Sequence, residues 1–120
     1  MEKVEFIEEF KKRTKVFALR IIKLYQFLPK TPESQIIGKQ LLRSCTSVAA
    51  NYRAACRARS NAEFISKMGI VVEEADETVF WIELLIDAEL VRAEKISDLL
   101  KEANEILFIV SAASKTARKK

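Results

Sequence analysis

The scarcity of glycine and proline is the feature that most constrains what this chain can fold into. Its 120 residues include only two of each: Gly38, Gly69, Pro29 and Pro32. Tight turns between β-strands depend on these residue types, because glycine permits positive φ and proline presets a turn conformation. The chain therefore has too little turn chemistry for a β fold, and we expect an all-α protein.

Apolar residues recur at helical spacing along the chain, as in amphipathic helices. The pattern predicts four helices, at about residues 2–28, 32–58, 61–88 and 93–115. In the first helix, Phe10, Phe17 and Leu24 repeat every seven residues. The third helix carries a heptad pattern at Ile65, Met68, Val72, Ala75, Val79, Ile82 and Ile86. A heptad pattern of this kind is typical of a seam between packed helices.

Helix-start signals separate these segments. Thr31 followed by Pro32 fits an N-cap with proline at the first helical position. Ser60 stands three residues before Glu63, the spacing of a capping box. The fourth helix has Arg92 where a capping hydroxyl is expected, so its start is poorly marked.

Short connections between helices of similar length predict an up-down-up-down antiparallel four-helix bundle, with residues 1–120 as one domain. The third and fourth helices also carry more apolar surface than one seam can bury, including Phe80, Trp81 and Phe108. Monomers rarely expose large apolar patches, so we expect this surface to support self-association.

No uncharged run reaches the ~18 apolar residues that span a bilayer, and the charged N-terminus does not resemble a secretory signal. We therefore expect a cytoplasmic protein without membrane contact. Cys45 and Cys56 are eleven residues apart on one predicted helix. That spacing is roughly 16 Å along the axis, whereas a disulfide needs α-carbons within about 7 Å. We expect two buried thiols, and an intermolecular or redox role is the alternative.

Polar residues on the second and third helices are spaced to face each other. Arg43, Ser47 and Asn51 share one face of their helix, as Glu73 and Glu77 do on the next. If the two helices pair as a hairpin, Arg43 lies opposite Glu77 and Ser47 opposite Glu73. We predict that these five side chains form a buried structural network that sets the helix register, and a ligand or partner pocket is the alternative. Truncating one partner of such a buried ion pair costs about 3–5 kcal/mol, the loss expected for Arg43→Ala.

The charge distribution gives the bundle a basic end, where the N-terminus, the connection between the second and third helices, and the C-terminus meet. The basic residues expected there are Lys11, Lys12, Arg13, Lys15, Arg53, Arg57, Arg59, Lys115, Arg118, Lys119 and Lys120. A surface of this kind attracts a polyanion through phosphate contacts. No aromatic pair is interleaved with these residues, so stacking on single strands is not supported. The alternative is a solvated surface that is neutralised near the N-terminus by Glu2, Glu5, Glu8 and Glu9.

Several kinds of chemistry have no basis in the sequence. Without histidine, the chain lacks the commonest general base, the usual zinc ligand and the Glu-His pairs of ferritin-like metal sites. Gly38 and Gly69 are isolated, so no phosphate-binding glycine loop is present. We therefore expect no enzymatic activity, no cofactor and no metal.

Five segments together resemble a known family: residues 40–43 (QLLR), 47–52 (SVAANY), 60–67 (SNAEFISK), 73–78 (EEADET) and 81–85 (WIELL). They are similar to the four-helix bundle family that includes the protein encoded in intervening sequences of bacterial 23S ribosomal RNA. The accessory variability protein of diversity-generating retroelements belongs to the same superfamily. Many relatives carry Glu-Gly where this chain has Ala54 and Ala55.

The resemblance implies a homopentameric ring of bundles and adds no catalytic residue. In the retroelement branch it also implies a basic surface that contacts nucleic acid and a reverse transcriptase. Our first functional hypothesis is a non-enzymatic homo-oligomeric adaptor that binds structured RNA, other nucleic acid or a ribonucleoprotein through the basic end. The second is a protein-interaction scaffold without a nucleic-acid role, whose partner docks on apolar strips of the third or fourth helix.

Overall fold

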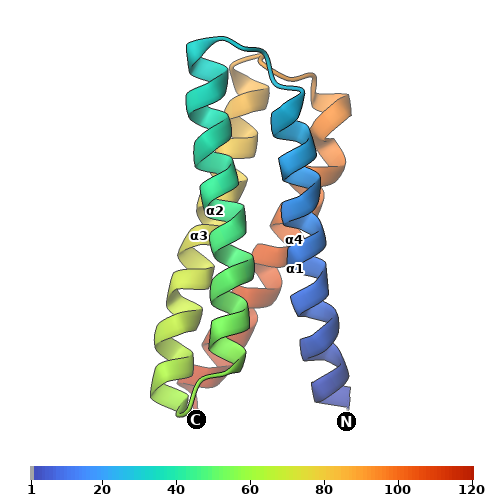
Figure 1. Ribbon diagram of the computed structural model, residues 1–120. Coiled ribbons are helices and arrows are strands. Elements are labelled where there is room, and N and C mark those ends of the chain that lie inside the picture. The colour runs from blue at the N-terminus through green and yellow to red at the C-terminus, as the bar shows by residue number, and fades with distance from the viewer. Residues whose placement is uncertain (1) are drawn as a thin grey trace.

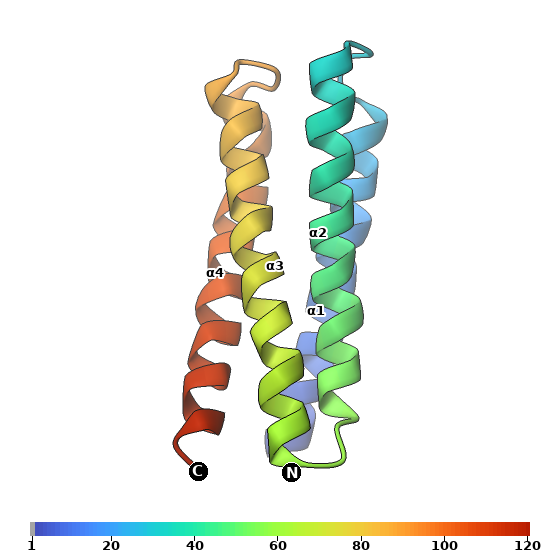
Figure 2. The same cartoon turned by 90° about the vertical axis from the view of Figure 1, so that its left-hand side faces the viewer.

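A computed structural model describes residues 2–120, apart from the side chain of Glu2; Met1, the first residue of the expected domain, lies outside this part. The described chain forms four α-helices: α1 (Glu2–Gln26), α2 (Pro32–Cys56), α3 (Asn61–Asp87) and α4 (Ala93–Arg118). They run alternately up and down as an antiparallel bundle (Figures 1 and 2), which confirms the predicted fold class. Figure 1 shows both chain ends and the α2–α3 connection at the same end of the bundle. The helix ends differ from the predicted ones by at most three residues.

The starts of α2 and α3 are capped by hydroxyl side chains. Thr31 Oγ1 accepts a hydrogen bond from the Ser34 backbone N–H at 3.4 Å, and Pro32 occupies the first turn. Ser60 Oγ accepts one from the Glu63 N–H at 3.0 Å. These bonds satisfy backbone donors that have no partner within the helix. Arg92 makes no side-chain cap at the start of α4. The capped starts at Thr31 and Ser60 and the uncapped start at Arg92 are confirmed, but of the predicted capping box only the Ser60 half is found among the described residues.

The end of α3 is a turn that usually contains glycine. Glu89 has φ 59°, the left-handed conformation. The Leu90 N–H bonds the Leu85 carbonyl at 3.0 Å, and the Glu89 N–H bonds the Ile86 carbonyl at 2.9 Å. This pair of bonds is the Schellman motif, in which glycine normally occupies the left-handed position. A glutamate there is strained, because its Cβ crowds the backbone.

The core confirms the apolar stripe predicted for α1 but changes the one predicted for α3. Phe10, Phe17 and Ile21 are buried, and Leu24 packs beside them. On α3 the fully buried residues are Met68, Val71, Ala75, Thr78, Val79, Ile82 and Leu85. Three positions of the predicted heptad, Ile65, Val72 and Ile86, are only half-buried. The reason is that α3 packs against both α2 and α4, so its buried face is centred between two neighbours.

Exposed apolar side chains are concentrated on α1, whereas the sequence predicted them on the third and fourth helices. The exposed large apolar residues of α1 and its following turn are Val4, Phe6, Val16, Leu19, Ile22 and Phe27. Elsewhere in the described chain, Ile36 on α2, Ile70 and Phe80 on α3 and Phe108 on α4 are exposed to a comparable degree. Trp81 is half-buried instead, because its indole packs against the core. Within residues 2–120, no helix has an apolar stretch long enough to cross a membrane.

Candidate nucleic-acid interface

The predicted ion pair between α2 and α3 forms, with an additional partner. One guanidinium nitrogen of Arg43 donates to Glu77 Oε1, and the other donates to Glu74 Oε1 at 3.0 Å. The indole N–H of Trp81 donates to the same Glu77 oxygen at 3.1 Å. Arg43 Nε donates to Gln40 on its own helix at 3.0 Å. The cluster therefore holds the outer edges of the two helices together.

The rest of the predicted network differs from expectation in burial and membership. The Arg43 side chain is 47% exposed, so the ion pair lies at the surface. Asn51 donates to the Ser47 carbonyl and hydroxyl oxygens, each at 3.0 Å, and these two residues bond within α2. Glu73 is exposed and takes no part, because it is rotated by about 100° from Glu74, which faces α2. The arrangement favours neither a buried network nor a ligand pocket.

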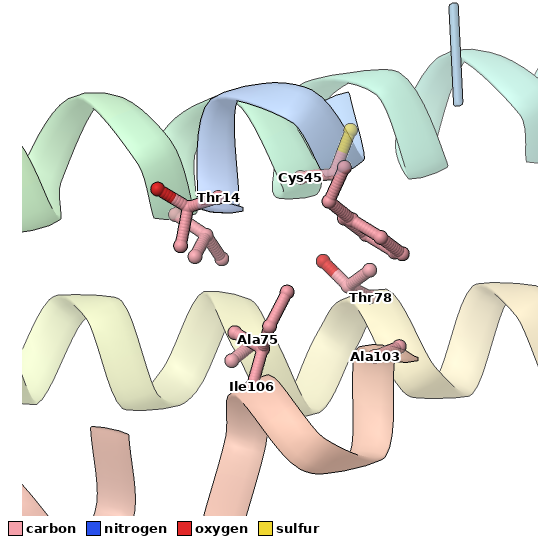
Figure 3. A pocket seen from close by; sticks show the side chains of 8 residues that line it. Thr14, Cys45, Ala75, Thr78, Ala103 and Ile106 are labelled. Atoms are coloured by element: carbon pink, nitrogen blue, oxygen red, sulfur yellow. The ribbon is translucent and has the colours of Figure 1, made fainter. Parts of the chain in front are cut away.

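The centre of the bundle contains a small cavity (Figure 3), where Thr14 and Cys45 lie opposite Ala75, Thr78, Ala103 and Ile106. Its volume is about 10 Å³. A cavity needs roughly 10–15 Å³ to hold one water molecule, so there is no room for a larger ligand.

The hydroxyl groups near this cavity already have partners. Thr78 Oγ1 lies 2.9 Å from Ser44 Oγ and 2.8 Å from the Glu74 carbonyl oxygen. Thr14 Oγ1 donates to the Lys11 carbonyl at 3.0 Å. The buried polar link between α2 and α3 is therefore Ser44–Thr78. The sequence did not indicate this pair, because Ser44 is one of several small residues at the centre of α2.

Five of the predicted basic residues meet in one open groove between α1 and α2, which we call the basic groove. They are Lys11, Lys12 and Lys15 from α1, with Arg53 and Arg57 from the C-terminal part of α2 and its end. The floor is made of the small residues Ala18, Thr46, Ala49 and Ala50, and the volume is about 710 Å³. Because the floor residues are short, the long cationic side chains stand along both sides of an accessible channel. The structure thus brings together residues about forty positions apart in the sequence.

Two acidic residues reduce the positive charge of the basic groove. Glu8 and Glu9 also line it, and Lys11 Nζ pairs with Glu8 Oε2 at 2.9 Å. The charge of Lys11, one of the five cations, is therefore already compensated by Glu8. The other four are not in any ion pair found within the described chain. In contrast, the outer face of α3 exposes Glu73, Asp76, Glu83 and Asp87.

Arg13 lies outside the basic groove, although it was predicted as part of the basic surface. Its guanidinium forms two bonds of 2.7 Å to the Glu102 carboxylate and one of 2.8 Å to Glu105, both on α4. The hydrogen bond to Glu102 is the main cause that raises the pKa of Arg13 above its usual value. Arg13 therefore links α1 to α4, and its charge is already compensated.

The remaining predicted cations are exposed but lie apart from the basic groove. Arg59 lies in the α2–α3 connection, and Lys115, Arg118 and Lys119 lie at the end of α4. Lys120 lines a different cleft, close to the N-terminal turns of α1. The predicted basic residues thus fall into two sets: those that line the basic groove, and exposed charges dispersed over the same end of the bundle.

The two cysteines are free and differ in their surroundings. Cys45 is buried as expected, and burial raises its pKa to about 12. Cys56 is half-buried, contrary to expectation, and its pKa is also raised, mainly by burial. Both thiols are therefore protonated at neutral pH. Among the described residues, no three His, Cys, Asp or Glu side chains gather closely enough to hold a metal ion.

Comparison with known families gives a match over residues 8–112 to the model of the 23S rRNA-intervening sequence protein family. The chain belongs to this family. The matched range includes the basic groove, the whole of α2 and α3, and most of α1 and α4. The resemblance suggested by the sequence motifs is thus confirmed for this family.

A solved crystal structure agrees with that membership. A protein of unknown function of the S23 ribosomal protein family from Bacteroides thetaiotaomicron is 38% identical to this chain. The similarity covers 91% of this chain and 97% of that one, with a TM-score of 0.83. A search of curated proteins gives no match. The two proteins share the family and the fold, and the function of that relative is unknown.

Proposed function

We propose that the protein is a non-enzymatic adaptor that binds structured RNA through the basic groove between α1 and α2. The observation that carries this proposal is the convergence of five cations from two helices on one channel with a floor of small residues. The family description, with its link to 23S rRNA, supports RNA as the polyanion.

The groove chemistry favours contacts to phosphates over contacts to bases. No aromatic side chain is among its described lining residues, so it offers no platform for base stacking. Lysine and arginine side chains on both sides suit a backbone that presents a phosphate at each step. We therefore expect binding that depends on RNA shape and charge more than on sequence.

A salt titration tests the proposal. If all five cations contact phosphates, the slope of log affinity against log salt is about −3 to −5. Replacing Lys15, Arg53 and Arg57 by glutamine should reduce the magnitude of that slope by about 2 to 3. Fluorescence anisotropy of a labelled structured RNA measures both quantities. An unchanged affinity and slope in this triple variant would rule out the basic groove as the site.

Two further triple variants with the same charge change locate the effect. Glutamine at Arg92, Lys95 and Lys101 alters exposed cations near the start of α4, at the opposite end of the bundle, and should leave binding nearly intact. Glutamine at Arg59, Arg118 and Lys119 tests the dispersed charges of the basic end. If only this last variant loses RNA affinity, the interface lies at the end of the bundle and not in the basic groove.

Self-association is part of the proposal, as a homo-oligomeric ring of the pentameric kind that the resemblance implied. It is supported by the exposed apolar side chains of α1 and its following turn, among which Phe27 is 85% exposed. A ring would repeat the basic groove around its axis and multiply the phosphate contacts. Light scattering coupled to size-exclusion chromatography measures the number of subunits, and a monomer at micromolar concentration would contradict this part.

The rival function is a protein-interaction scaffold, and the same α1 side chains favour it. Phe6, Leu19 and Phe27 are exposed and offer apolar anchors to a protein partner. A reverse transcriptase is the partner suggested by the retroelement branch of the superfamily. Recovery of one protein partner after nuclease treatment, together with absent RNA binding at low salt, would favour the scaffold over the adaptor.

A further inference from the structure

A second cleft opens at the end of the bundle where the chain termini lie, and we call it the end cleft. Its volume is about 430 Å³, within the range typical of small-molecule sites. All four helices contribute to it. Its apolar walls include Ile7, Tyr52, Ala55, Phe64, Ala113 and Ala117.

The end cleft exists because the first turns of α1 diverge from the other helices. Figure 1 shows the N-terminal part of α1 running away from the end of α4, and residues of both segments line the end cleft. The facing positions Ala55, Ala113 and Ala117 are too small to fill the space. Phe6 is 53% exposed, although its ring stacks on Phe10 at 5.9 Å between centroids.

Two contacts join neighbouring helices in the walls of the end cleft. Tyr52 is only 5% exposed, and its ring packs edge-on against Phe10 at 4.9 Å between centroids. The Asn61 side chain donates to the Ala117 carbonyl at 3.2 Å and so joins the start of α3 to the end of α4. These contacts join α1 to α2 and α3 to α4 around the end cleft.

The charges around the end cleft have one sign. Lys3 and Lys120 line it, and both side chains are exposed. None of its described lining residues is Asp or Glu. An apolar channel beside two ammonium groups is complementary to a ligand with an alkyl chain and one anionic head.

We propose that the end cleft binds an amphipathic carboxylate with a single alkyl chain, of the fatty-acid class. The chain would lie against the alanine and aromatic walls, and the carboxylate would lie between the Lys3 and Lys120 ammonium groups. This site shares no cation with the basic groove, so it stands independently of RNA binding.

Cys56 provides a direct readout, because its thiol lines the end cleft and is half-buried, whereas Cys45 is buried in the core. In a Cys45→Ala variant, Cys56 is the single thiol. Its rate of alkylation at one fixed pH should fall as dodecanoate is added below its micellar concentration. At about 100 times the dissociation constant, the rate should fall by up to about 100-fold. Dodecyltrimethylammonium should protect far less, because the lysines repel its head.

Two variants make the test specific to the end cleft. Ala113→Phe fills the cleft and should abolish binding of labelled dodecanoate in equilibrium dialysis. Ala112→Phe places the same side chain at an exposed neighbouring position and should retain binding. Exchanging Lys3 and Lys120 for glutamate should reverse the preference between the anionic and cationic chains. Far-UV circular dichroism confirms that each variant is folded.

Three results would overturn the inference. Equal protection by anionic and cationic chains would show unspecific apolar adsorption. Full dodecanoate binding by Ala113→Phe would place the ligand elsewhere. Sedimentation with anionic phospholipid vesicles, without binding of free dodecanoate, would assign the surface to a membrane. RNA affinity should be unchanged in the Ala113→Phe variant, so the two proposals can fail separately.

Discussion

The two glycines allow the same substitution to be tested in two opposite environments. Both lie inside helices, Gly38 in α2 and Gly69 in α3. A Cβ built at Gly38 would lie 2.6 Å from Leu28 Cδ1 and 2.8 Å from Tyr25 Cδ1. A Cβ at Gly69 would meet no atom within 4 Å beyond its chain neighbours and the nearby backbone of α3. Gly38 thus permits the close approach of the end of α1, whereas Gly69 has no such role.

These distances give the expected sign and size. Gly69→Ala should stabilise the fold by about 0.8–1.0 kcal/mol, the difference in helix propensity between the two residues. Gly38→Ala gains the same free energy from helix propensity, but overpacking costs about 1–3 kcal/mol. Leu28 is 3% exposed, and the Tyr25 hydroxyl donates to Gln35 at 2.7 Å, so neither neighbour moves freely. The net result is a loss of about 0–2 kcal/mol.

Urea unfolding followed by far-UV circular dichroism measures both free energies of unfolding. The two variants should differ by about 1–3 kcal/mol, with unchanged dependence on urea concentration. If Gly38→Ala proves as stable as Gly69→Ala, the end of α1 does not pack as closely on Gly38 as the structure shows.

The remaining predictions concern single side chains. A double-mutant cycle of Arg13→Ala and Glu102→Ala should give a coupling free energy of about 1–2 kcal/mol, because the ion pair is bidentate. The coupling should be smaller in high salt, because the pair is partly solvated. A coupling of zero would mean that this pair does not link α1 to α4. Arg43→Ala should cost less than about 1 kcal/mol in unfolding experiments, and not the 3–5 kcal/mol of a buried pair. Glu89→Gly should raise the melting temperature through a gain of about 1 kcal/mol, because it relieves the left-handed strain, and a lower value would contradict the observed turn. Burial raises the pKa of Cys45 from 9.0 to about 12, so the folded chain keeps a proton that the unfolded chain releases above pH 9. Its contribution to stability is present below pH 9 and is lost as pH rises towards 12, by about 1.4 kcal/mol per pH unit. Cys45→Ala should flatten this decline relative to the unsubstituted protein, and identical slopes would mean that the thiol is not shielded.

The basic groove could be predicted from the sequence only in part. Antiparallel topology alone places the chain ends and the α2–α3 connection together, so the basic end followed from the order of the charges. Lys12 and Arg13 are neighbours in the sequence, yet one lines the basic groove and the other pairs with α4. Successive helical residues point about 100° apart, and the rotation of each helix about its axis therefore decides which cation is available.

The same limit applies to the polar pair between α2 and α3. Four-residue spacing correctly predicted that Arg43 meets Glu77. It could not distinguish Glu73 from Glu74, nor show that the contact lies at the rim of the interface. The end cleft was not predicted at all, because it depends on the tilt of α1 relative to the other helices.

By itself, the sequence determined the number of helices, their approximate ends and the capped starts at Thr31 and Ser60, because helix formation and capping depend on residues close together in the chain. The tertiary structure alone decided the rotation and tilt of each helix. The apolar stripe of each helix is broad enough to be buried at several rotations of the helix about its axis. The packing of side chains from different helices selects one of these rotations. The selected rotations place five of the predicted cations around the basic groove. The tilt of α1 leaves its first turns far enough from α4 for the end cleft to form.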